Sequence, residues 1–426
     1  MMTSVRLTYP YAAAAAAGVA LAYVAWRRRR RRGPQLSLTA LRDNLALRQA
    51  FQSRIGLDIG GTLAKLVFLS NKELLDRLSL SEDATVHSAL SFSLSKGDST
   101  LHFVILPTDM LEATCRSIHN RMSWPAADQS VRRIVAAGGG AIRFREMFHD
   151  VLQVQLLPFK ELQAVVEGLL FLSAQGPAHD ELFTIDPSSS SPSSGREVSV
   201  PWPTTEPLFP FLLVNMGSGV SVLRVDAPHS FTRVGGTACG GATFLGLARA
   251  LTGEGDFQRL MALAASGSEA EVDKCVGDIY GEAGCKDLGM PPTFTAASFG
   301  RLATAPASAL QRPGHAADCV AALLRMVAQA SVVLAKAYAS TMDPACMQRV
   351  FFVGGFVGAA GNTLARKLIA ESMSAVGGRA LFCRHAEFLG ALGSLAACVH
   401  LRESELAAQT QSEQAAAAHT CMQDSL

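Results

Sequence analysis

The sequence predicts an α/β protein of two lobes built from a duplicated domain. Residues 55–68 and 212–225 carry this prediction. In each, an apolar run leads into a small polar side chain, then two or three residues with little or no side chain, then a second apolar run. This pattern is typical of a β-hairpin whose turn lets a ligand approach the backbone. Because 426 residues suit two cores better than one, we expect two such domains to close on one phosphate-bearing ligand.

Composition indicates a globular chain with reduced thiols. Apolar residues make up 49% of it and charged residues 17%, which excludes intrinsic disorder. The first 32 residues hold seven arginines and no acid, so the remainder holds 31 basic and 36 acidic residues. That balance predicts no nucleic-acid partner. The nine cysteines form no Cys-x-x-Cys pair, which disfavours a disulfide framework or zinc site and favours a body that faces the cytosol.

The N-terminal segment, residues 1–52, could be a mitochondrial presequence, although such a presequence would be more amphipathic, and two other interpretations fit it better. Residues 7–26 carry no charge and are rich in alanine, and six arginines follow at 27–32. That length could span a bilayer, and the basic flank would keep the body cytoplasmic, tethered to an organelle membrane through residues 7–32. Because alanine contributes little insertion free energy, a frayed extension without a targeting role is the alternative. Residues 36–52 predict a helical linker.

The first hairpin opens the N-terminal lobe, which we assign to residues 53–172. Glycine in its turn permits positive φ and frees N–H groups for an anion. Asp58 ends the incoming strand and places a carboxylate beside the turn, where it could hold a magnesium-bound water. Lys65 follows the turn and could neutralise phosphate charge, although an ordinary strand lysine facing water is the alternative. The candidate phosphate-binding residues of the turn are Gly60, Gly61 and Thr62.

Further strands and a helix complete this lobe. Alternating runs in residues 67–106 predict antiparallel strands, and residues 131–137 predict another. The latter leads into Gly138-Gly-Gly-Ala141, which is either a ligand-facing turn or a tight corner. Apolar residues at helical spacing predict a helix that begins just after Pro158. Glu161 lies in its first turn, where an acid by itself is most simply explained by the helix dipole.

The C-terminal lobe, residues 211–401, follows a segment rich in Ser, Pro and Gly. That segment, residues 173–210, predicts a surface loop between the lobes. The second hairpin then presents a second bare turn at Gly217, Ser218 and Gly219.

A glycine-rich stretch, residues 231–246, next runs into a helix. Free N–H groups and the helix dipole make such an entrance a ready anion site. Arg233 could pair with a carboxylate or phosphate there, although a lone arginine is more often a surface charge. Later, an apolar strand at 350–353 ends in Gly354 and Gly355, which suits the approach of an adenosine to the backbone.

The remaining pattern predicts packing elements. Residues 253–299 look helical, and 316–339 predict a long helix whose apolar positions serve core or dimer packing. A strand at 380–383 and a helix at 388–399 close the lobe. The polar, alanine-rich tail, residues 402–426, is expected to be disordered.

Together these motifs resemble the phosphate loops of the actin, sugar-kinase and Hsp70 ATPase fold, and most closely the eukaryotic-type (type II) pantothenate kinases. The resemblance runs from about residue 55 to 399. It implies a two-lobed ribonuclease-H-like fold of the actin/hexokinase type, with a nucleotide cleft between the duplicated domains. The matching motifs, in the family's order, are Asp58-Ile-Gly-Gly-Thr62 with Lys65, Val214-Asn-Met-Gly-Ser-Gly-Val220, Arg233-Val with Gly236-Thr237, and Thr243-Phe-Leu-Gly246.

The resemblance implies an ATP-dependent pantothenate kinase, the enzyme of the first step of coenzyme A biosynthesis. It transfers the γ-phosphate of ATP to the primary hydroxyl of pantothenate to give 4'-phosphopantothenate. The family's catalytic base corresponds to Glu161, with Lys160 in place of the usual aspartate. ATP and Mg²⁺ would lie against the two turns, Asp58 and Lys65, with Gly354 and Gly355 at the adenosine.

The family also binds an inhibitory acyl-CoA, such as acetyl-CoA, in the substrate pocket and forms homodimers. On this resemblance, pantothenate or the acyl-CoA would contact Ser218, Ser221, Arg233, Gly236 and Thr237. The sequence departs from the family at four positions, where Thr, Ser, Gly and Asn are usual: Gly235, Ala238, Ala242 and Gly355.

Three other functions remain open at this point. A sugar kinase of the same fold would have an aspartate base in a sugar-binding motif, which the sequence lacks. A catalytically weak or inactive homologue that senses acyl-CoA would be expected to lose the base or the arginine, and both are retained. A chaperone-type ATPase would need a peptide-binding domain after the ATPase, and we expect none in so short a tail.

Overall fold

Two compact units make up the computed structural model. One contains the residues up to Pro177 and those from Phe388 onward, and the other contains Ala178–Glu387. The chain therefore passes between the units twice. The predicted membrane segment and the predicted disordered tail lie outside the described residues. The structure describes residues 55–70, 85–94, 100–121, 132–152, 154–175, 181–186, 195–202, 208–283, 290, 292–358 and 362–399.

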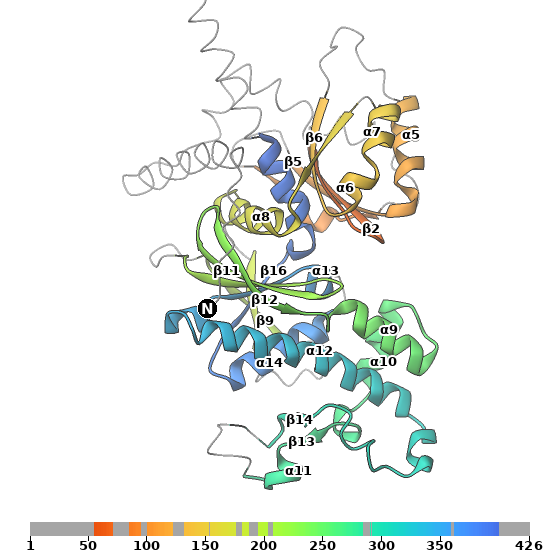
Figure 1. The fold of residues 1–426 in the computed structure, drawn as a ribbon, viewed down its shortest axis with the longest axis vertical. Coiled ribbons are helices and arrows are strands. Elements are labelled where there is room, and N and C mark those ends of the chain that lie inside the picture. Colours follow the sequence, from red (N-terminus) through yellow and green to blue (C-terminus); the bar gives the residue numbers. More distant parts are fainter. Residues whose placement is uncertain are drawn as a thin grey trace, which may run out of the picture. The chain divides into compact units, whose positions relative to one another are not determined.

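A seven-stranded mixed sheet forms the centre of the first unit (Figure 1). Its order is β3-β5-β2-β1-β6-β7, with β4 paired to β5. β1 and β2 are the predicted hairpin, with Asp58 opposite Lys65, while β6 and β7 run parallel to β1. The strands are β1 (Ile55–Ile59), β2 (Leu63–Ser70), β3 (Thr85–Val86), β4 (Phe92–Ser93), β5 (Thr100–Pro107), β6 (Arg132–Ala137) and β7 (Val154–Phe159).

Helices cover this sheet because its strands are apolar on both faces. Leu57, Ile59 and Leu156 belong to a buried cluster with residues of α5 and α7. A further helix over residues 389–399 lies against β1, where Gly56 leaves room for it. The helical elements of the unit are η2 (Ser88–Leu90), η3 (Thr108–Met110), α5 (Leu111–Arg121), α6 (Gly140–Arg143), α7 (Arg145–Leu152) and α8 (Glu161–Gln175), with η8 (Ala386–Phe388) at the second passage between the units.

Helix α8 begins at Glu161, not just after Pro158 as the apolar spacing predicts. Pro158 and Phe159 complete β7, where they pair with Ala136 and Ala137 of β6. The helix then packs closely against residues 389–399 through two glycines. A Cβ on Gly168 would lie 2.0 Å from the Leu389 carbonyl oxygen, and one on Gly393 would lie 1.9 Å from that of Ala164.

The second unit repeats the arrangement of the first. Its sheet has the order β12-β11-β10-β15-β16-β8-β9, in which β10 and β11 form the second predicted hairpin. β12 pairs antiparallel to β11, and β15 and β16 run parallel to β10, just as β5, β6 and β7 flank the first hairpin. The predicted α/β fold of duplicated domains is confirmed. The strands are β8 (Leu182–Asp186), β9 (Arg196–Val200), β10 (Phe211–Met216), β11 (Val220–Ala227), β12 (Ser230–Thr237), β15 (Val350–Val353) and β16 (Ala380–Cys383), with β13 (Lys274–Cys275) and β14 (Thr295–Ala297) forming a separate pair.

One face of this sheet packs on helices to form the main buried cluster, which includes Val214, Val222 and Phe352 together with residues of α9, α10, α12 and α14. Helix α12 is long and apolar enough to cross a membrane by length and composition alone, but most of its buried apolar residues belong to this cluster, so it is a core helix. The helical elements are α9 (Gly241–Thr252), α10 (Phe257–Ser266), η4 (Glu269–Glu271), α11 (Gly277–Tyr280), η6 (Ala307–Gln311), α12 (His315–Ala339), η7 (Pro344–Gln348), α13 (Gly355–Gly358) and α14 (Thr363–Ala375).

Three predictions about this half of the chain are wrong. The supposed loop 173–210 contains β8 and β9, because the apolar run Leu182–Ile185 is buried beside β16 despite its Ser- and Pro-rich surroundings. Residues 253–299, expected to be helical, hold α10 but also β13 and β14. The final helix, residues 389–399, belongs to the first unit.

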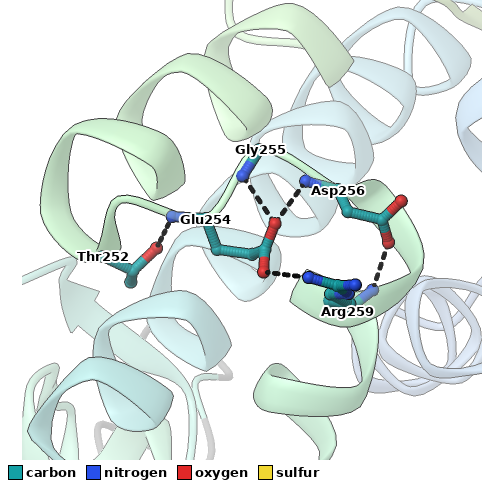
Figure 2. Close-up of polar contacts among 5 residues, drawn as sticks. All are labelled: Thr252, Glu254, Gly255, Asp256 and Arg259. Atoms are coloured by element: carbon teal, nitrogen blue, oxygen red, sulfur yellow. Dashed lines mark hydrogen bonds and ion pairs between the residues drawn. The ribbon is translucent and has the colours of Figure 1, made fainter.

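The connection from α9 to α10 is fixed by local hydrogen bonds (Figure 2). Helix α9 ends where Gly253 takes a φ of 77°. The Glu254 carboxylate accepts hydrogen bonds from the N–H groups of Gly255 and Asp256, and the bond from Asp256 is the main cause of its lowered pKa. Asp256 caps α10 by accepting from the N–H of Arg259 at 2.8 Å, which stabilises a helix by roughly 1 kcal/mol.

We predict that Gly393→Ala lowers the free energy of unfolding by roughly 1–3 kcal/mol, because its methyl group would overlap the carbonyl of Ala164. Equilibrium urea unfolding measures this change. Gly246→Ala is the matched control, since this exposed α9 residue has no atom within 4 Å of the added Cβ. It should raise stability by about 0.5–1 kcal/mol, and equal destabilisation by both changes would contradict the packing argument.

Candidate active site

The candidate site residues of the first unit lie at one edge of its sheet. β1, β6 and β7 are adjacent and parallel, with Asp58 opposite Ala137 and Ala137 opposite Phe159. Their carboxyl ends therefore meet, bringing together the turn after Asp58, the glycines at 138–140 and Glu161. In open α/β sheets, ligands bind outside the carboxyl ends of the parallel strands. The strand order thus brings these sequence motifs together in this unit.

The first turn is held so that its N–H groups remain available. The N–H of Gly60 donates to the Leu63 carbonyl at 3.0 Å. The Thr108 hydroxyl donates to the Gly60 carbonyl at 3.0 Å, and the Thr108 N–H donates to the Thr62 carbonyl at 2.9 Å. Within the described part of the chain, no group accepts from the N–H of Gly61 or Thr62. Both residues are exposed, so the turn can bind an anion through its backbone.

Thr108 is a site residue that the sequence analysis missed. It is 3% exposed and follows β5, in which Pro107 pairs with Leu63 beside the turn. Its local sequence, Pro107-Thr108-Asp109, is that of many turns and helix entrances, so no local signal marks it. Only the pairing of β5 with β2 brings its hydroxyl to the first turn.

Asp58 is held in a space that only glycine neighbours leave open. A Cβ on Gly138 would lie 3.0 Å from Asp58 Oδ1, and one on Gly390 would lie 2.6 Å from Oδ2. Gly138 also has a φ of 81°, a conformation that other residues rarely adopt. Burial raises the pKa of the Asp58 carboxyl, and the charge of Lys65 partly offsets this rise. Asp58 and Lys65, which the sequence places on either side of the glycine turn, thus lie opposite one another and interact electrostatically.

Glu161, the first residue of α8, interacts electrostatically with both Asp58 and Lys65. Partial burial raises the pKa of its carboxyl, the negative charge of Asp58 raises it further, and Lys65 lowers it. The side chain is nevertheless exposed to solvent. A solvent-accessible carboxylate with increased proton affinity can act as a general base. The structure thus groups Asp58, Lys65 and Glu161, which lie far apart in the sequence.

The second turn lies at the corresponding edge of the second unit. The N–H of Gly217 donates to the Gly219 carbonyl at 2.9 Å. The N–H groups of Gly241 and Ala242, at the start of α9, donate to the carbonyls of Gly217 and Ser218. The N–H donors expected to bind an anion at the start of α9 are thus largely bonded to carbonyl groups of the protein. The free donors lie instead in the turn, where the N–H groups of Ser218 and Gly219 bond to none of the residues that the structure describes.

A β-bulge brings Arg233 to Ser221. The register of β11 and β12 shifts between Val222, opposite Gly235, and Leu223, opposite Arg233, so Arg233 faces the side of the sheet on which Ser221 lies. Its Nε–H donates to Ser221 Oγ at 3.2 Å. Its Nη2 lies over Gly236, where a Cβ would be only 2.5 Å away. Three of the predicted substrate residues therefore meet on one sheet face.

The other two predicted substrate residues lie elsewhere. Ser218 is in the second turn. Thr237 pairs with Val220, next to the Ser221–Gly236 pair, so its side chain points to the opposite face. Its Oγ1 accepts the Cys239 N–H at 3.0 Å, which gives Thr237 a role in shaping the strand-to-helix turn.

Gly354 and Gly355 follow β15 at the same edge as the second turn. Gly354 has a φ of 97°, and a Cβ there would lie 2.6 Å from both Asn215 Oδ1 and the Met216 carbonyl oxygen. Gly355 begins α13. The bare backbone that the sequence predicts for an adenosine is present at the end of β15, adjacent to β10.

The acidic side chains offer few metal ligands of their own. Among the residues described, no three His, Cys, Asp or Glu side chains group as a metal site. A cation at this edge would depend on Asp58 or Glu161 together with groups that a ligand brings.

Comparison with known proteins identifies the family. Residues 54–397 match the model of the Fumble family. The chain belongs to this family. The resemblance to eukaryotic-type pantothenate kinases, drawn from the motifs alone, is confirmed.

Curated relatives carry related names. Pantothenate kinase 1 of Arabidopsis thaliana is 32% identical over 80% of this chain and 85% of its own length. Pantothenate kinase 2 of Oryza sativa subsp. japonica is 32% identical over 80% of this chain, and the mouse 4'-phosphopantetheine phosphatase is 29% identical over 84%. The chain spans only 38% and 42% of the lengths of these last two.

The chain is also similar to a solved structure, an activator of 2-hydroxyisocaproyl-CoA dehydratase from Clostridium difficile with bound ADPNP. The match covers 82% of this chain and 96% of the activator chain, with 15% sequence identity and a TM-score of 0.42.

The departure at Gly235 has a structural explanation. Tyr338 of α12 fills the space beside this glycine, and a Cβ there would lie 2.0 Å from the tyrosine hydroxyl oxygen. The threonine usual in the family would collide with Tyr338. Nothing in the structure explains the departures at Ala238 and Ala242.

We predict that Gly235→Thr lowers the free energy of unfolding by roughly 1–3 kcal/mol, because Tyr338 occupies the space. In a Tyr338→Ala background the same change should cost at least about 1 kcal/mol less, since contacting residues couple by roughly 0.5–3 kcal/mol. Urea unfolding of the four proteins of this cycle measures the coupling. Additive effects would show that the two side chains do not compete for space.

We predict that Thr108→Val weakens binding of ATP, the ligand that the sequence predicts for the first turn, by about tenfold. Valine keeps the shape but leaves the Gly60 carbonyl without its donor, a loss of roughly 1–3 kcal/mol for a buried group. Titration calorimetry measures the affinity. Thr108→Ser keeps the hydroxyl and should bind ATP within about twofold of the parent protein. A valine variant that binds as tightly as the serine variant would exclude the role of this hydroxyl.

Proposed function

We propose that this protein is an ATP-dependent pantothenate kinase that transfers the γ-phosphate to the primary hydroxyl of pantothenate and so begins coenzyme A biosynthesis. The observation that carries the proposal is the grouping of Asp58, Lys65 and Glu161 beside a glycine turn with free N–H groups. Membership of a family whose curated relatives include pantothenate kinases supports the substrate.

Phosphoryl transfer requires mainly positioning and charge stabilisation, because negative charge spreads over the transferring phosphate. The N–H groups of both turns, at Gly61, Thr62, Ser218 and Gly219, are suited to bind phosphate oxygens of ATP. Lys65 adds a positive charge beside the first turn. The bare backbone at Gly354 and Gly355 is assigned to the adenosine.

Glu161 accepts the proton of the attacking hydroxyl in this proposal. The oxygen of pantothenate then forms its bond to the γ-phosphorus as the bond to the β-phosphate oxygen breaks, and ADP leaves. The raised pKa of Glu161 increases its affinity for that proton at neutral pH. General base catalysis of this kind contributes on the order of 10²–10⁴ in rate.

The residues of the first unit fit Mg²⁺. This ion usually binds proteins through one or two carboxylates and completes its shell with water and phosphate oxygens. Asp58 and Glu161 repel one another, and burial and that repulsion raise the pKa of Glu161. Asp58 would hold the ion through a water molecule. When bound, Mg²⁺ neutralises phosphate charge and thereby favours transfer.

Arg233, Ser221 and Ser218 are the assigned contacts to pantothenate. The guanidinium is held at one end by Ser221 and lies over Gly236, and it can pair with a carboxylate of the substrate. Thr237 supports the turn beside them through Cys239.

Three finer features complete the proposal. Inhibition by an acyl-CoA at the same residues rests on the family resemblance, as does a homodimer. Exposed apolar side chains at Leu247 and Leu251 of α9 and Val333 of α12 also support a dimer. Attachment of a cytosol-facing body to an organelle membrane is supported by the apolar and then basic pattern of residues 7–32.

The test is ADP release by the full chain with pantothenate, glucose or no acceptor. We expect only pantothenate to stimulate turnover, and Glu161→Gln to lower kcat by at least about 10²-fold. Because the base works deprotonated and its pKa is raised, activity of the parent protein should fall on the acid side at a pH above the ordinary range of a carboxyl. The remaining activity of the glutamine variant should lack this acid limb.

Glu146→Gln is the matched control, since Glu146 is an exposed acid in the first turn of α7. It should leave kcat and its pH profile unchanged. Stimulation by glucose instead of pantothenate would identify a sugar kinase. ATP or acyl-CoA binding without turnover would identify an inactive homologue.

A further inference from the structure

A buried cluster of ionisable side chains lies in the second unit, outside the residues assigned to the reaction. Glu181, Cys383 and His385 are 2%, 3% and 3% exposed. Glu181 immediately precedes β8, and the other two stand at the end of β16, its antiparallel neighbour. The cluster therefore links the start of β8 to the end of β16.

The Glu181 carboxylate uses both its oxygens. Oε1 accepts a hydrogen bond from Cys383 Sγ at 2.8 Å and from the backbone N–H of His385 at 3.4 Å. Oε2 lies 2.7 Å from His385 Nδ1, which donates to it. The Glu181 carbonyl in turn accepts the Arg384 N–H at 3.1 Å. Residues 383–385 are thus bound to Glu181 through both side chains and backbone.

Such a cluster is costly to keep for stability alone. Removing a carboxylate from water disfavours folding unless it is fully hydrogen-bonded, and apolar side chains of similar volume are often as stabilising or more so. What the polar cluster adds is a defined position for the backbone that it binds, because hydrogen bonds are directional whereas apolar packing is not.

The backbone that follows the cluster supports the Gly354 turn. The carbonyl of Ala386, next to His385, accepts the N–H of Gly354 at 3.3 Å. At the other end of α13, Gly358 rests on Glu387, where a Cβ would lie 2.7 Å from the Glu387 nitrogen. Both ends of the short helix after β15 therefore lie against residues 386–387, which the cluster anchors.

We propose that the Glu181–His385 pair positions the Gly354 turn for the nucleotide. Neither residue needs to contact ATP: the pair fixes residues 383–385, these fix the Ala386 carbonyl, and that carbonyl orients Gly354. The inference rests on the proposed function in one respect, namely that the Gly354 turn binds the adenosine of ATP. Glu181 and His385 are positioning residues in this sense, and pantothenate affinity is independent of them.

The experiment compares variants of the full chain by the dissociation constant of ATP, measured by titration calorimetry without pantothenate, and by steady-state kinetics. Glu181→Gln removes the charge, and His385→Leu removes the donor to Oε2. We expect both to weaken ATP binding by about tenfold, corresponding to about 1.4 kcal/mol, and to raise the KM for ATP with it. The KM for pantothenate should change by less than about twofold.

Two controls separate positioning from general stability. His385→Asn can restore a donor where Nδ1 lies, and it should recover ATP affinity to within about threefold of the parent protein. Val320→Ala, in the buried part of α12, should lower the melting temperature without changing ATP affinity. If Glu181→Gln and His385→Leu lower the melting temperature as Val320→Ala does and leave ATP affinity unchanged, the positioning role is overturned.

The same data separate this inference from the proposed function. A parent protein that binds ATP but does not phosphorylate pantothenate would refute the kinase proposal, while the ATP affinities of the variants would still decide the role of the pair. A parent protein that does not bind ATP would refute both. An equal rise in the KM for both substrates would also overturn the inference, since it would indicate a general disturbance of the unit.

Discussion

The close approach of backbone to backbone at the carboxyl ends of parallel strands is the constraint on which the candidate residues of each unit depend. Asp58 fits only because Gly138 and Gly390 have no side chain, and Gly354 must be glycine because Asn215 and Met216 lie against it. A methyl group at any of these positions would enter space already filled by protein. The absence of side chains there leaves turn N–H groups as the donors that face a ligand.

The two units use the same sheet arrangement with different chemistry. In the first, the hairpin register sets Asp58 opposite Lys65, and in the second it sets Asn215 opposite Ser221. The candidate residues of the first unit are therefore charged, and they include Glu161 at the start of α8. Those of the second unit are neutral hydrogen-bonding groups and Arg233.

Each glycine turn is fixed by hydrogen bonds from residues that lie outside its own sequence motif. Thr108 fixes the carbonyls of the first turn, and the N–H groups at the start of α9 fix those of the second. The Ala386 carbonyl accepts the N–H of Gly354, and the buried Glu181 bonds His385, the residue before Ala386. In the two hairpin turns these supports work because a backbone carbonyl that is already bonded cannot rotate outward, so the free N–H groups stay exposed.

The two hairpins and their bare turns follow from the sequence alone, because each lies within about 15 residues as apolar alternation and glycine placement. The candidate base Glu161 needed the family resemblance, because an acid in the first turn of a helix is by itself explained by the helix dipole. Which of these motifs lie together depends on the tertiary structure. Thr108 lies at the first turn because β5 pairs with β2, and Gly390 lies against Asp58 because residues 389–399 return to the first unit. Glu181 meets His385 because β8 pairs with β16, and the bulge that turns Arg233 towards Ser221 likewise needs two paired strands. Compositional averages also concealed β8 within its Ser- and Pro-rich surroundings, because burial of a five-residue strand depends on the neighbour it pairs with.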